Sequence, residues 1–245
     1  MIETEELIYY FREPQTYGWI EMELSDYLIT HIWNCVNDAK GNAKSGLIGH
    51  IDKSIAMQDK KGILFDQLLK PLIVAYGNKW GHDHHKIGIA PPRKKSDPSL
   101  GGFCSIGNYE YKLDQFWVNY QNQHEFNPVH NHGGCYSFAA WLKIPTDYYE
   151  QNQHYNAKDA NGSMNSAFLF HYTDSLGNMR STVYEQRPEM EGTLLFFPSR
   201  LNHEVHPYYE CDEQRISISG NIWLKECTAA EMKDKSKLRV SYQSK

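Results

Sequence analysis

The chain lacks the features that would place it in a membrane, in an oxidising compartment or on a polyanion. Its five cysteines are scattered and contain no CxxC pair, so neither a disulfide framework nor a thiolate zinc site is indicated. No run approaches the roughly 18 to 20 apolar residues of a membrane span. A formal net charge of −5 gives no general attraction for phosphate. The acidic N-terminus does not resemble a signal peptide, so we expect a reduced, cytoplasmic protein without a membrane partner.

Internal repeats and low-complexity segments are absent as well, and what remains is the composition of a globular protein. Hydrophobic residues make up 40% and aromatic residues 13% of the 245 positions. This is enough apolar material for a sizeable core. We therefore expect an ordered chain throughout most of its length.

The spacing of apolar residues changes near residue 100. Before it, residues 23–40 and 59–80 place apolar side chains three and four positions apart, which predicts helices, with Pro71 expected to kink or break the second. After it, short runs rich in β-branched and aromatic residues predict strands. These runs cover 112–120, 135–145, 166–172, 181–187, 192–198 and 215–224. Their connections are short and rich in turn residues, which favours antiparallel pairing.

These patterns together predict an α+β fold with a jelly-roll core. The core is expected over 101–225, with a mainly helical support region over 1–100 packed on one sheet. Residues 226–245, rich in lysine and serine, are expected to form a peripheral tail. We expect residues 1–245 to form a single domain.

The triplet His130-Asn131-His132 precedes one of the predicted core strands. Residues two apart on a strand project to the same face, about 6.6 Å apart, so both imidazoles could reach one ion. Taken alone the H-x-H signal is weak in a chain with 12 histidines, and polar residues before a core strand are the more common explanation. The similar triplet His50-Ile51-Asp52 and the H-x-H within 82–85 lie in polar segments, and we interpret both as surface.

Downstream, residues 192–224 contain a second histidine and an arginine in a defined order. We expect an apolar strand, a short strand with His203, and a hairpin turn near 208–211 that brings Arg215 back beside His203. Arg215, Ser217 and Ser219 then share one face. That face is either a half-exposed polar edge or an anion pocket, because a guanidinium binds carboxylate through two parallel hydrogen bonds.

Taken together, these residues resemble the Fe(II)- and 2-oxoglutarate-dependent oxygenases, which are built on a double-stranded β-helix. In that family an H-x-D or H-x-E and a later histidine hold the iron. An arginine ten to a dozen residues further on, often in R-x-S, binds the distal carboxylate of 2-oxoglutarate. Here Arg215-Ile216-Ser217 matches R-x-S and begins twelve residues after His203. The resemblance covers roughly residues 116–224.

Two further patterns refine the resemblance. Tyr120, Phe126 and His130 approximate the spacing of the prolyl-hydroxylase type. The pattern EFNP-x-H-x-H followed by S-F-x-x-W-x-K-I-P is similar to a subgroup common in tailed-phage genomes, which would place the protein in a host cytoplasm.

The resemblance implies an enzyme, a dioxygenase that uses Fe(II), 2-oxoglutarate and O2. The implied iron ligands are His130, His132 and His203. The implied cosubstrate residues are Arg215, Ser217 and Tyr120. The reaction would hydroxylate an unactivated C–H bond with release of succinate and CO2, and a protein side chain such as proline is favoured over a nucleic acid or small molecule.

One position departs from the family pattern, because His132 stands where the family has a carboxylate. Glu125 and Glu204 are nearby carboxylates that could replace one imidazole, although strand alternation predicts that both face away. An all-imidazole site also suits zinc, nickel or copper. Two alternatives therefore stay open, a cupin-like three-histidine dioxygenase that does not use 2-oxoglutarate and a non-catalytic jelly-roll that binds a sugar or a partner protein.

Overall fold

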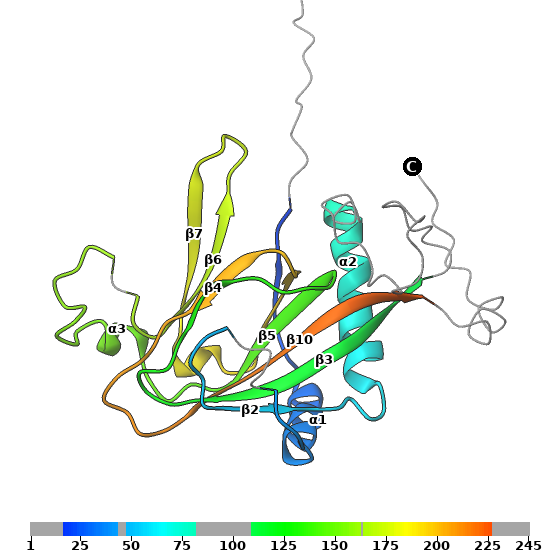
Figure 1. Ribbon diagram of the computed structural model, residues 1–245, viewed down its shortest axis with the longest axis horizontal. Coiled ribbons are helices and arrows are strands. Elements are labelled where there is room, and N and C mark those ends of the chain that lie inside the picture. Colours follow the sequence, from blue (N-terminus) through cyan, green and yellow to red (C-terminus); the bar gives the residue numbers. More distant parts are fainter. Residues whose placement is uncertain (1–16, 44–47, 82–108, 163, 227–245) are drawn as a thin grey trace, which may run out of the picture.

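Two antiparallel sheets face each other in the computed structural model, which describes residues 17–43, 48–81, 109–162 and 164–226 (Figure 1). The large sheet has six strands in the order β1-β8-β5-β10-β3-β2, and the small sheet has four in the order β4-β9-β6-β7. All neighbouring strands pair antiparallel. This is the two-sheet arrangement of a jelly-roll, and the predicted antiparallel core is confirmed.

The strands predicted after residue 100 are all present, close to their expected bounds. The large sheet contains β3 (Tyr109–Gln121), β5 (Tyr136–Lys143), β8 (Thr193–Pro198) and β10 (Arg215–Glu226). The small sheet consists of β4 (Asn127–His130), β6 (Ala167–Thr173), β7 (Met179–Glu185) and β9 (Asn202–Val205). Strand β5 is buried along almost its whole length because both of its faces are covered, which explains its continuous apolar run.

The region before residue 100 contributes strands as well as helices. Strand β1 (Ile20–Glu23) pairs with β8, and β2 (Lys53–Ala56) pairs with β3, so both edges of the large sheet come from this region. Four residues are too few to show a readable alternation, which is why the sequence did not indicate them. The expectation of a mainly helical region is therefore correct only in part.

Both predicted helices form. Helix α1 (Asp26–Asn37) begins after Ser25, whose side-chain oxygen accepts a hydrogen bond from the Leu28 N–H. The second segment runs without a break from a π-helical turn, η2 (Phe65–Leu69), into α2 (Lys70–Trp80). Pro71 does not end it, because the Lys70 N–H donates to the Phe65 carbonyl five residues back, and this wider turn accommodates the missing proline donor.

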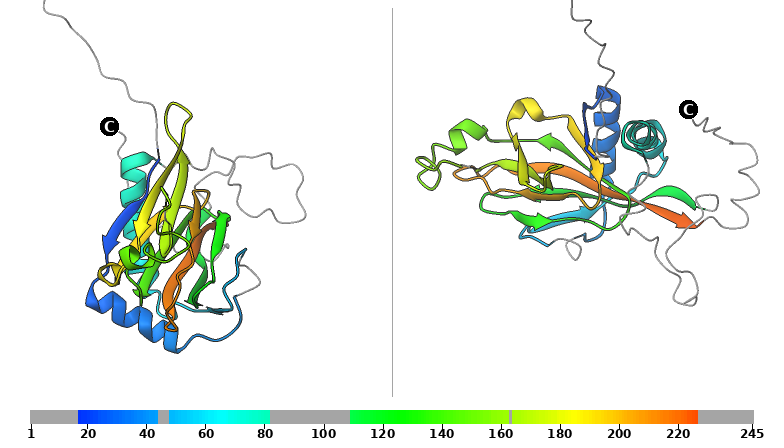
Figure 2. Two further views of the ribbon diagram at one scale, coloured as in Figure 1. Left: turned by 90° about the vertical axis from the view of Figure 1, so that its left-hand side faces the viewer. Right: turned by 90° about the horizontal axis from the view of Figure 1, so that it is seen from above.

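The sheets and helices form layers with a core on each side of the large sheet (Figure 2). Helices α1 and α2 pack on one face, where Ile32 of α1 and Ile73 of α2 belong to one hydrophobic cluster with Val118 and Ile218 of the sheet. The small sheet covers the other face through an aromatic core. That core includes Trp141, Phe168, Phe170 and Phe197. The expected packing of helices on one sheet is thus present.

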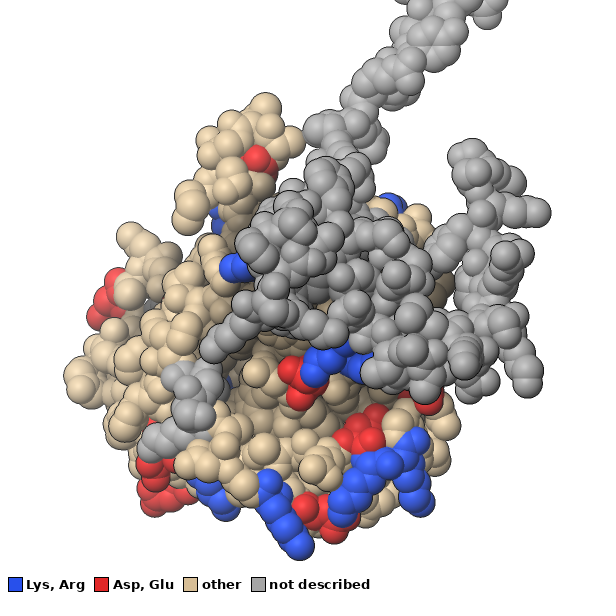
Figure 3. Space-filling view, turned by 45° about the vertical axis from the view of Figure 1, so that its right-hand side comes forward, with Lys and Arg blue, Asp and Glu red and all other residues tan. Residues whose placement is uncertain are grey.

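Two short helical turns connect strands of the core. A one-turn helix, α3 (Tyr148–Gln151), follows β5, and a 3-10 turn, η5 (Pro188–Met190), precedes β8. Acidic and basic side chains intermix on the face shown in Figure 3. No helix in the described ranges is long and apolar enough to cross a membrane. The triplet at 82–85 and residues 227–245 of the predicted tail lie outside the described residues.

Candidate metal centre and anion pocket

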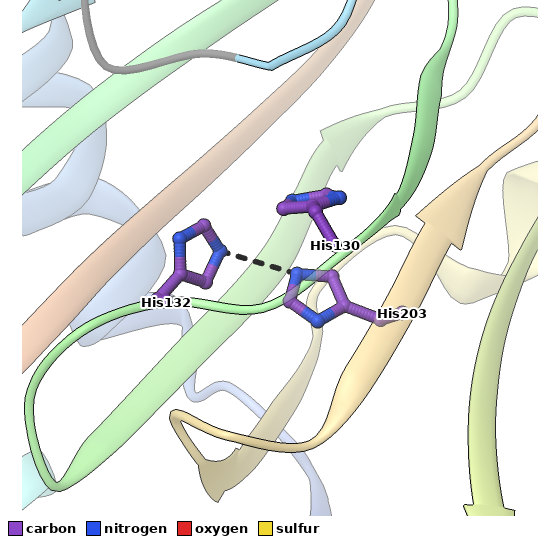
Figure 4. A group of neighbouring side chains, drawn as sticks. All are labelled: His130, His132 and His203. Atoms are coloured by element: carbon purple, nitrogen blue, oxygen red, sulfur yellow. Dashed lines mark hydrogen bonds between the residues drawn. The ribbon is translucent and has the colours of Figure 1, made fainter. Parts of the chain in front are cut away.

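Three histidines from two segments of the chain converge between the two sheets (Figure 4). His130 ends β4 and lies directly opposite His203 of β9, while His132 lies in the loop after β4. The ring centroids are 4.3 Å apart for His130 and His203, 5.0 Å for His130 and His132, and 4.9 Å for His132 and His203. One nitrogen from each ring lies within 4.8 Å of the others, so the three could hold one metal ion.

The loop after β4 gives His132 its position by a route different from the predicted one. The strand ends at His130, so the two histidines do not share a strand face. Instead, the His132 N–H donates to the Ser199 carbonyl at 2.8 Å, which ties this loop to the turn before β9. Gly134 then adopts a φ of +101°, and a Cβ there would lie 2.7 Å from the Ile222 carbonyl oxygen. Only glycine fits this close approach.

Backbone carbonyls orient two of the rings. The Nδ1 atom of His130 lies 2.7 Å from the Pro128 oxygen, and that of His203 lies 2.9 Å from the Leu201 oxygen. Because a carbonyl can only accept, each Nδ1 carries the hydrogen and each Nε2 keeps its lone pair. The Nε2 atoms of His132 and His203 are 3.2 Å apart. A neutral imidazole with a free Nε2 lone pair is the form that ligates a metal.

Burial keeps the three rings neutral. It lowers the pKa of His130, and burial together with the nearby His130 lowers the pKa of His132 to about 4. The pKa of His203 lies well below its ordinary value, first because of burial and then because of the other two rings. Phe168 stacks on His203 with centroids 5.6 Å apart, and Phe197 meets the same ring edge-on at 5.1 Å. The three rings therefore form a mostly buried, neutral donor set.

The opposite end of the same cavity carries polar side chains of the large sheet. As predicted, Arg215, Ser217 and Ser219 share one face of β10, and all three line the cavity that contains the histidines. The paired positions on β3 line it too. These are Gln121 opposite Arg215, Asn119 opposite Ser217 and Trp117 opposite Ser219.

The path of the chain from His203 to Arg215 corrects the predicted hairpin. Strand β9 belongs to the small sheet and β10 to the large sheet, so residues 206–214 cross between the sheets. The Tyr208 hydroxyl anchors this crossing, since it lies 2.7 Å from the carbonyl oxygens of both Gln121 and Glu213. Arg215 consequently faces the histidines across the cavity and not along a shared ladder.

Arg215 is a buried cation held by neutral groups. It is 1% exposed, and its Nη2 donates to the Ser166 hydroxyl at 2.8 Å while its Nη1 donates to the Gln121 amide oxygen at 3.3 Å. The guanidinium lies 4.9 Å from the centroid of the Tyr208 ring. Burial lowers the Arg215 pKa to about 10, which leaves the side chain charged at neutral pH.

No carboxylate of the described residues forms an ion pair with Arg215, and its Nε is buried without a hydrogen-bond partner. A buried charge without a counter-charge is costly. An anion in the cavity would remove that cost, so this end of the cavity is suited to bind one.

Tyr120 is not brought to the cavity. It lies between Asn119 and Gln121 on β3, and alternation directs it to the opposite face. There it packs against the helical core, with the Lys53 ammonium 4.1 Å from its ring centroid. The position of Tyr120 therefore gives no support to its predicted cosubstrate role, which stays a prediction, and the neighbouring Gln121 is the residue that contacts Arg215.

The two carboxylates considered as replacements for His132 are also directed elsewhere. Glu125 accepts hydrogen bonds from the backbone N–H groups of Asp52 and Asn122 at 2.9 and 2.8 Å. Glu204 lies 2.8 Å from the Nε2 of His171. Within the described ranges, the group around His130 consists of histidines alone.

Three contributors were missed by sequence reasoning. Asn119 and Gln121 are polar residues at alternate positions of an apolar strand, and this pattern could have indicated an inward polar face. Ser166 gave no such signal. It adopts a φ of +55° and is fully buried, and only the fold places its hydroxyl against Arg215 and Thr146.

Comparison with protein families gives one match over this region. Residues 115–221 match the model of a family described as "Putative 2OG-Fe(II) oxygenase". The matched span contains the three histidines, Arg215 and Ser217. The family implies Fe(II), 2-oxoglutarate and O2, and the three histidines could bind the iron. No curated protein matches the chain.

Several solved structures are similar over most of the chain. A prolyl-4-hydroxylase from Pseudomonas putida is 13% identical, with 87% of this chain and 95% of that chain covered and a TM-score of 0.44. An oxidoreductase of the 2OG-Fe(II) oxygenase family from Burkholderia pseudomallei is 11% identical, with 84% of each chain covered and a TM-score of 0.47. A prolyl hydroxylase from Trichoplax adhaerens, in complex with a peptide fragment of hypoxia inducible factor, is 14% identical, with 91% and 89% covered and a TM-score of 0.45. At these identities and TM-scores the similarity does not by itself indicate a function.

Proposed function

We propose that the chain is an Fe(II)- and 2-oxoglutarate-dependent dioxygenase that hydroxylates an unactivated C–H bond. One observation carries the proposal. A buried Arg215, without a carboxylate partner among the described residues, faces the same cavity as three convergent neutral imidazoles. The imidazoles could thus bind a metal ion and Arg215 an anion, at opposite ends of one cavity.

The histidine end fits Fe(II). Imidazole is a suitable ligand for iron, and three protein ligands leave positions open for other groups. His130 and His203 present their Nε2 lone pairs because their Nδ1–H groups are held by backbone carbonyls. Bound iron would supply the activation of O2, while the aromatic walls around His203 exclude water.

The arginine end fits the distal carboxylate of 2-oxoglutarate. Arg215 would bind it through its planar fork, with Ser217 of the same strand face as a second donor. Ser166 and Gln121 hold the guanidinium from behind, so its orientation is fixed before the cosubstrate arrives. The Arg215 Nε, which has no hydrogen-bond partner among the described residues, supplies a free donor.

The proposed reaction consumes one O2 and one 2-oxoglutarate for each C–H bond hydroxylated. One oxygen atom enters the new hydroxyl group and the other enters succinate, with CO2 released. We propose a protein side chain such as proline as the favoured substrate, on the sequence resemblance to the prolyl-hydroxylase type. The single domain over 1–245, the phage origin and the cytoplasmic location likewise remain predictions from the sequence.

The test is a succinate assay on the full-length protein with Fe(II), 2-oxoglutarate and O2. Peptide, nucleic-acid and small-molecule pools from a cell lysate would be supplied separately, with succinate measured against reactions that lack iron. We expect succinate to rise most with the peptide pool. Calorimetry of 2-oxoglutarate with the Fe(II)-loaded protein under anaerobic conditions gives a second readout, and absence of binding there would contradict the proposal.

A second candidate is a three-histidine dioxygenase that does not use 2-oxoglutarate. It is favoured by one observation, the imidazole of His132 where a carboxylate is usual. Such an enzyme would consume O2 with a chelating substrate and form no succinate, so the same assay separates the two. In the third case, a non-catalytic binding protein, a chelator would change the thermal stability of wild type and of His203→Ala by the same amount, because the cavity would hold no metal.

A further inference from the structure

A second group of metal-ligand side chains lies on the helical side of the large sheet. His31 and Cys35 are four residues apart on α1, and Asp59 lies in the connection between β2 and η2. One donor atom from each lies within 4.8 Å of the other two. Cys35 and α1 belong to the helical core, so this group is on the opposite face of the large sheet from the histidine cavity.

The separation of the His31 nitrogen and the Cys35 sulfur matches that of two ligands on a tetrahedral ion. The Nε2 of His31 is 3.6 Å from the Cys35 sulfur and 3.0 Å from an Asp59 oxygen. Zinc bonds of about 2.3 Å to sulfur and about 2.0 Å to nitrogen, at a tetrahedral angle, place the two donors about 3.5 Å apart. The sulfur and nitrogen therefore already have the required separation, and the oxygen is a few tenths of an ångström too close.

A single ring nitrogen faces two partners in this group. The same nitrogen, His31 Nε2, faces both the thiol and the carboxylate. If it carries a hydrogen and donates to Asp59, the Cys35 thiol has no lone pair there to donate to. If it accepts from the thiol, its lone pair also faces the carboxylate oxygen. A cation would use the lone pairs of all three.

The three donor side chains are mostly buried, and a neighbouring cavity gives an ion access to them. The side chains of His31 and Asp59 are 13% and 6% exposed, and Cys35 is 7% exposed. The second Asp59 oxygen accepts from the Phe65 N–H at 2.9 Å, which fixes the carboxylate. A cavity of about 470 Å³ borders Asp59 and Phe65 and could admit the ion and a water ligand.

We propose that His31, Cys35 and Asp59 bind a zinc ion, with the fourth position open to water. A nitrogen, a sulfur and an oxygen donor form a ligand set typical of zinc, and they differ from the all-imidazole centre in offering a thiolate. Binding displaces the thiol proton to the solvent. The ion would fasten α1 to the connection that leads from β2 into the second helix, and it is independent of the proposed function.

Cobalt is the probe that separates this centre from the histidine centre. Full-length protein, stripped of metal with a chelator, would be titrated with Co²⁺ alone and followed by absorption. A thiolate ligand gives an intense sulfur-to-cobalt charge-transfer band, which three imidazoles cannot give. We expect the intensity of this band to stop rising when one Co²⁺ ion is bound at the thiolate site of each protein molecule. The band should disappear when Zn²⁺ is added in competition.

Matched variants assign the band to its ligands. Cys35→Ser should abolish it, whereas Cys211→Ser, a change at a more exposed cysteine, should leave it unchanged. Asp59→Asn should weaken Co²⁺ binding by at least about tenfold, the lower range for disturbed metal sites. His203→Ala should keep the band, because it alters only the other centre.

Two outcomes would overturn the proposal. One is a wild-type titration without a thiolate band, and the other is a band that persists in Cys35→Ser. Far-ultraviolet circular dichroism of each metal-free variant guards against a folding defect. A folded Cys35→Ser protein that lacks the band, together with an intact Cys211→Ser protein, supports the site.

Discussion

The two ends of the cavity are built from different sheets and different chemistry. The histidine end comes from β4, β9 and the loop after β4, and its rings are neutral, orientated by backbone carbonyls and surrounded by aromatic side chains. The arginine end comes from the large sheet and carries a charge held by hydroxyl and amide groups. A neutral donor set accepts a cation, while a buried cation requires an anion. The cavity therefore offers a neutral donor set for a metal ion and a buried cation for an anion.

Because the two ends belong to different sheets, they can be disabled separately. A change at the histidine end should remove the metal, and with it any ligand that the metal holds. A change at the arginine end should weaken the anion alone. The following experiments use that asymmetry.

The largest effect is expected at His203. Replacing it with alanine removes the most buried of the three ligands, so the Fe(II) affinity should fall by more than about 100-fold, beyond the range for outer-shell changes. Succinate formation should fall to background. Metal content by mass spectrometry measures the first effect. His171→Ala is the control, since His171 pairs with Glu204 outside this group, and a similar loss there would point to a general folding defect.

Arg215→Ala comes next. It should weaken 2-oxoglutarate binding by about 2–5 kcal/mol, the usual cost of truncating one partner of a buried charge pair, while Fe(II) stays bound. Calorimetry measures the cosubstrate and mass spectrometry the metal. Arg215→Lys keeps the charge but loses the two-pronged contact, so it should fall between wild type and alanine. Unchanged 2-oxoglutarate affinity in Arg215→Ala would remove the anion pocket from the proposal.

The character of the third ligand can be tested at His132. His132→Glu introduces the carboxylate typical of the family at a similar side-chain length, so Fe(II) binding should stay within about tenfold of wild type, because two imidazoles and a carboxylate suit non-haem iron. His132→Ala should bind the metal more weakly than His132→Glu. If both variants lose succinate formation equally while both remain folded, the imidazole itself is required and the three-histidine alternative gains support.

A smaller effect is expected from the loop that carries His132. Gly134→Ala adds a Cβ that would lie 2.7 Å from the Ile222 oxygen at a φ of +101°. The left-handed backbone alone costs roughly 1–2 kcal/mol of unfolding free energy, and the clash should displace the loop and weaken Fe(II) binding. Gly177→Ala is the matched control, because Gly177 has a φ of +86° and open space around it. Its stability should fall while metal affinity stays unchanged.

The smallest effect is expected at Tyr120. Its ring lies on the far face of β3, so Tyr120→Phe should leave the 2-oxoglutarate affinity unchanged in calorimetry. Gln121→Ala removes a hydrogen-bond partner of the Arg215 guanidinium. It should weaken 2-oxoglutarate binding measurably, because a hydrogen bond to a charged group contributes about 1.5–3 kcal/mol. The reverse ranking would return Tyr120 to the candidate site.

Much of the strand content and the shared face of β10 could be read from the sequence. Alternation in residues 215–224 placed Arg215, Ser217 and Ser219 together, and the structure confirms this because side chains of a strand alternate whatever its partner. The short edge strands β1 and β2 were not predicted, because four residues are too few to show an alternation of apolar and polar side chains. Pro71 was expected to disturb a helix, yet a wider turn just before it absorbs the missing donor.

The sequence by itself determined the order and type of the longer elements. Together with the family resemblance, it predicted His130, His132, His203 and Arg215 as site residues, because residue type and spacing are local properties. Only the tertiary structure decided which sheet each strand joins. It therefore replaced the hairpin between His203 and Arg215 with a crossing, and it placed Gln121 beside Arg215 and Tyr120 on the other face of the sheet. The physical reason is that strand pairing depends on contacts between distant segments, which alternation along one segment does not encode.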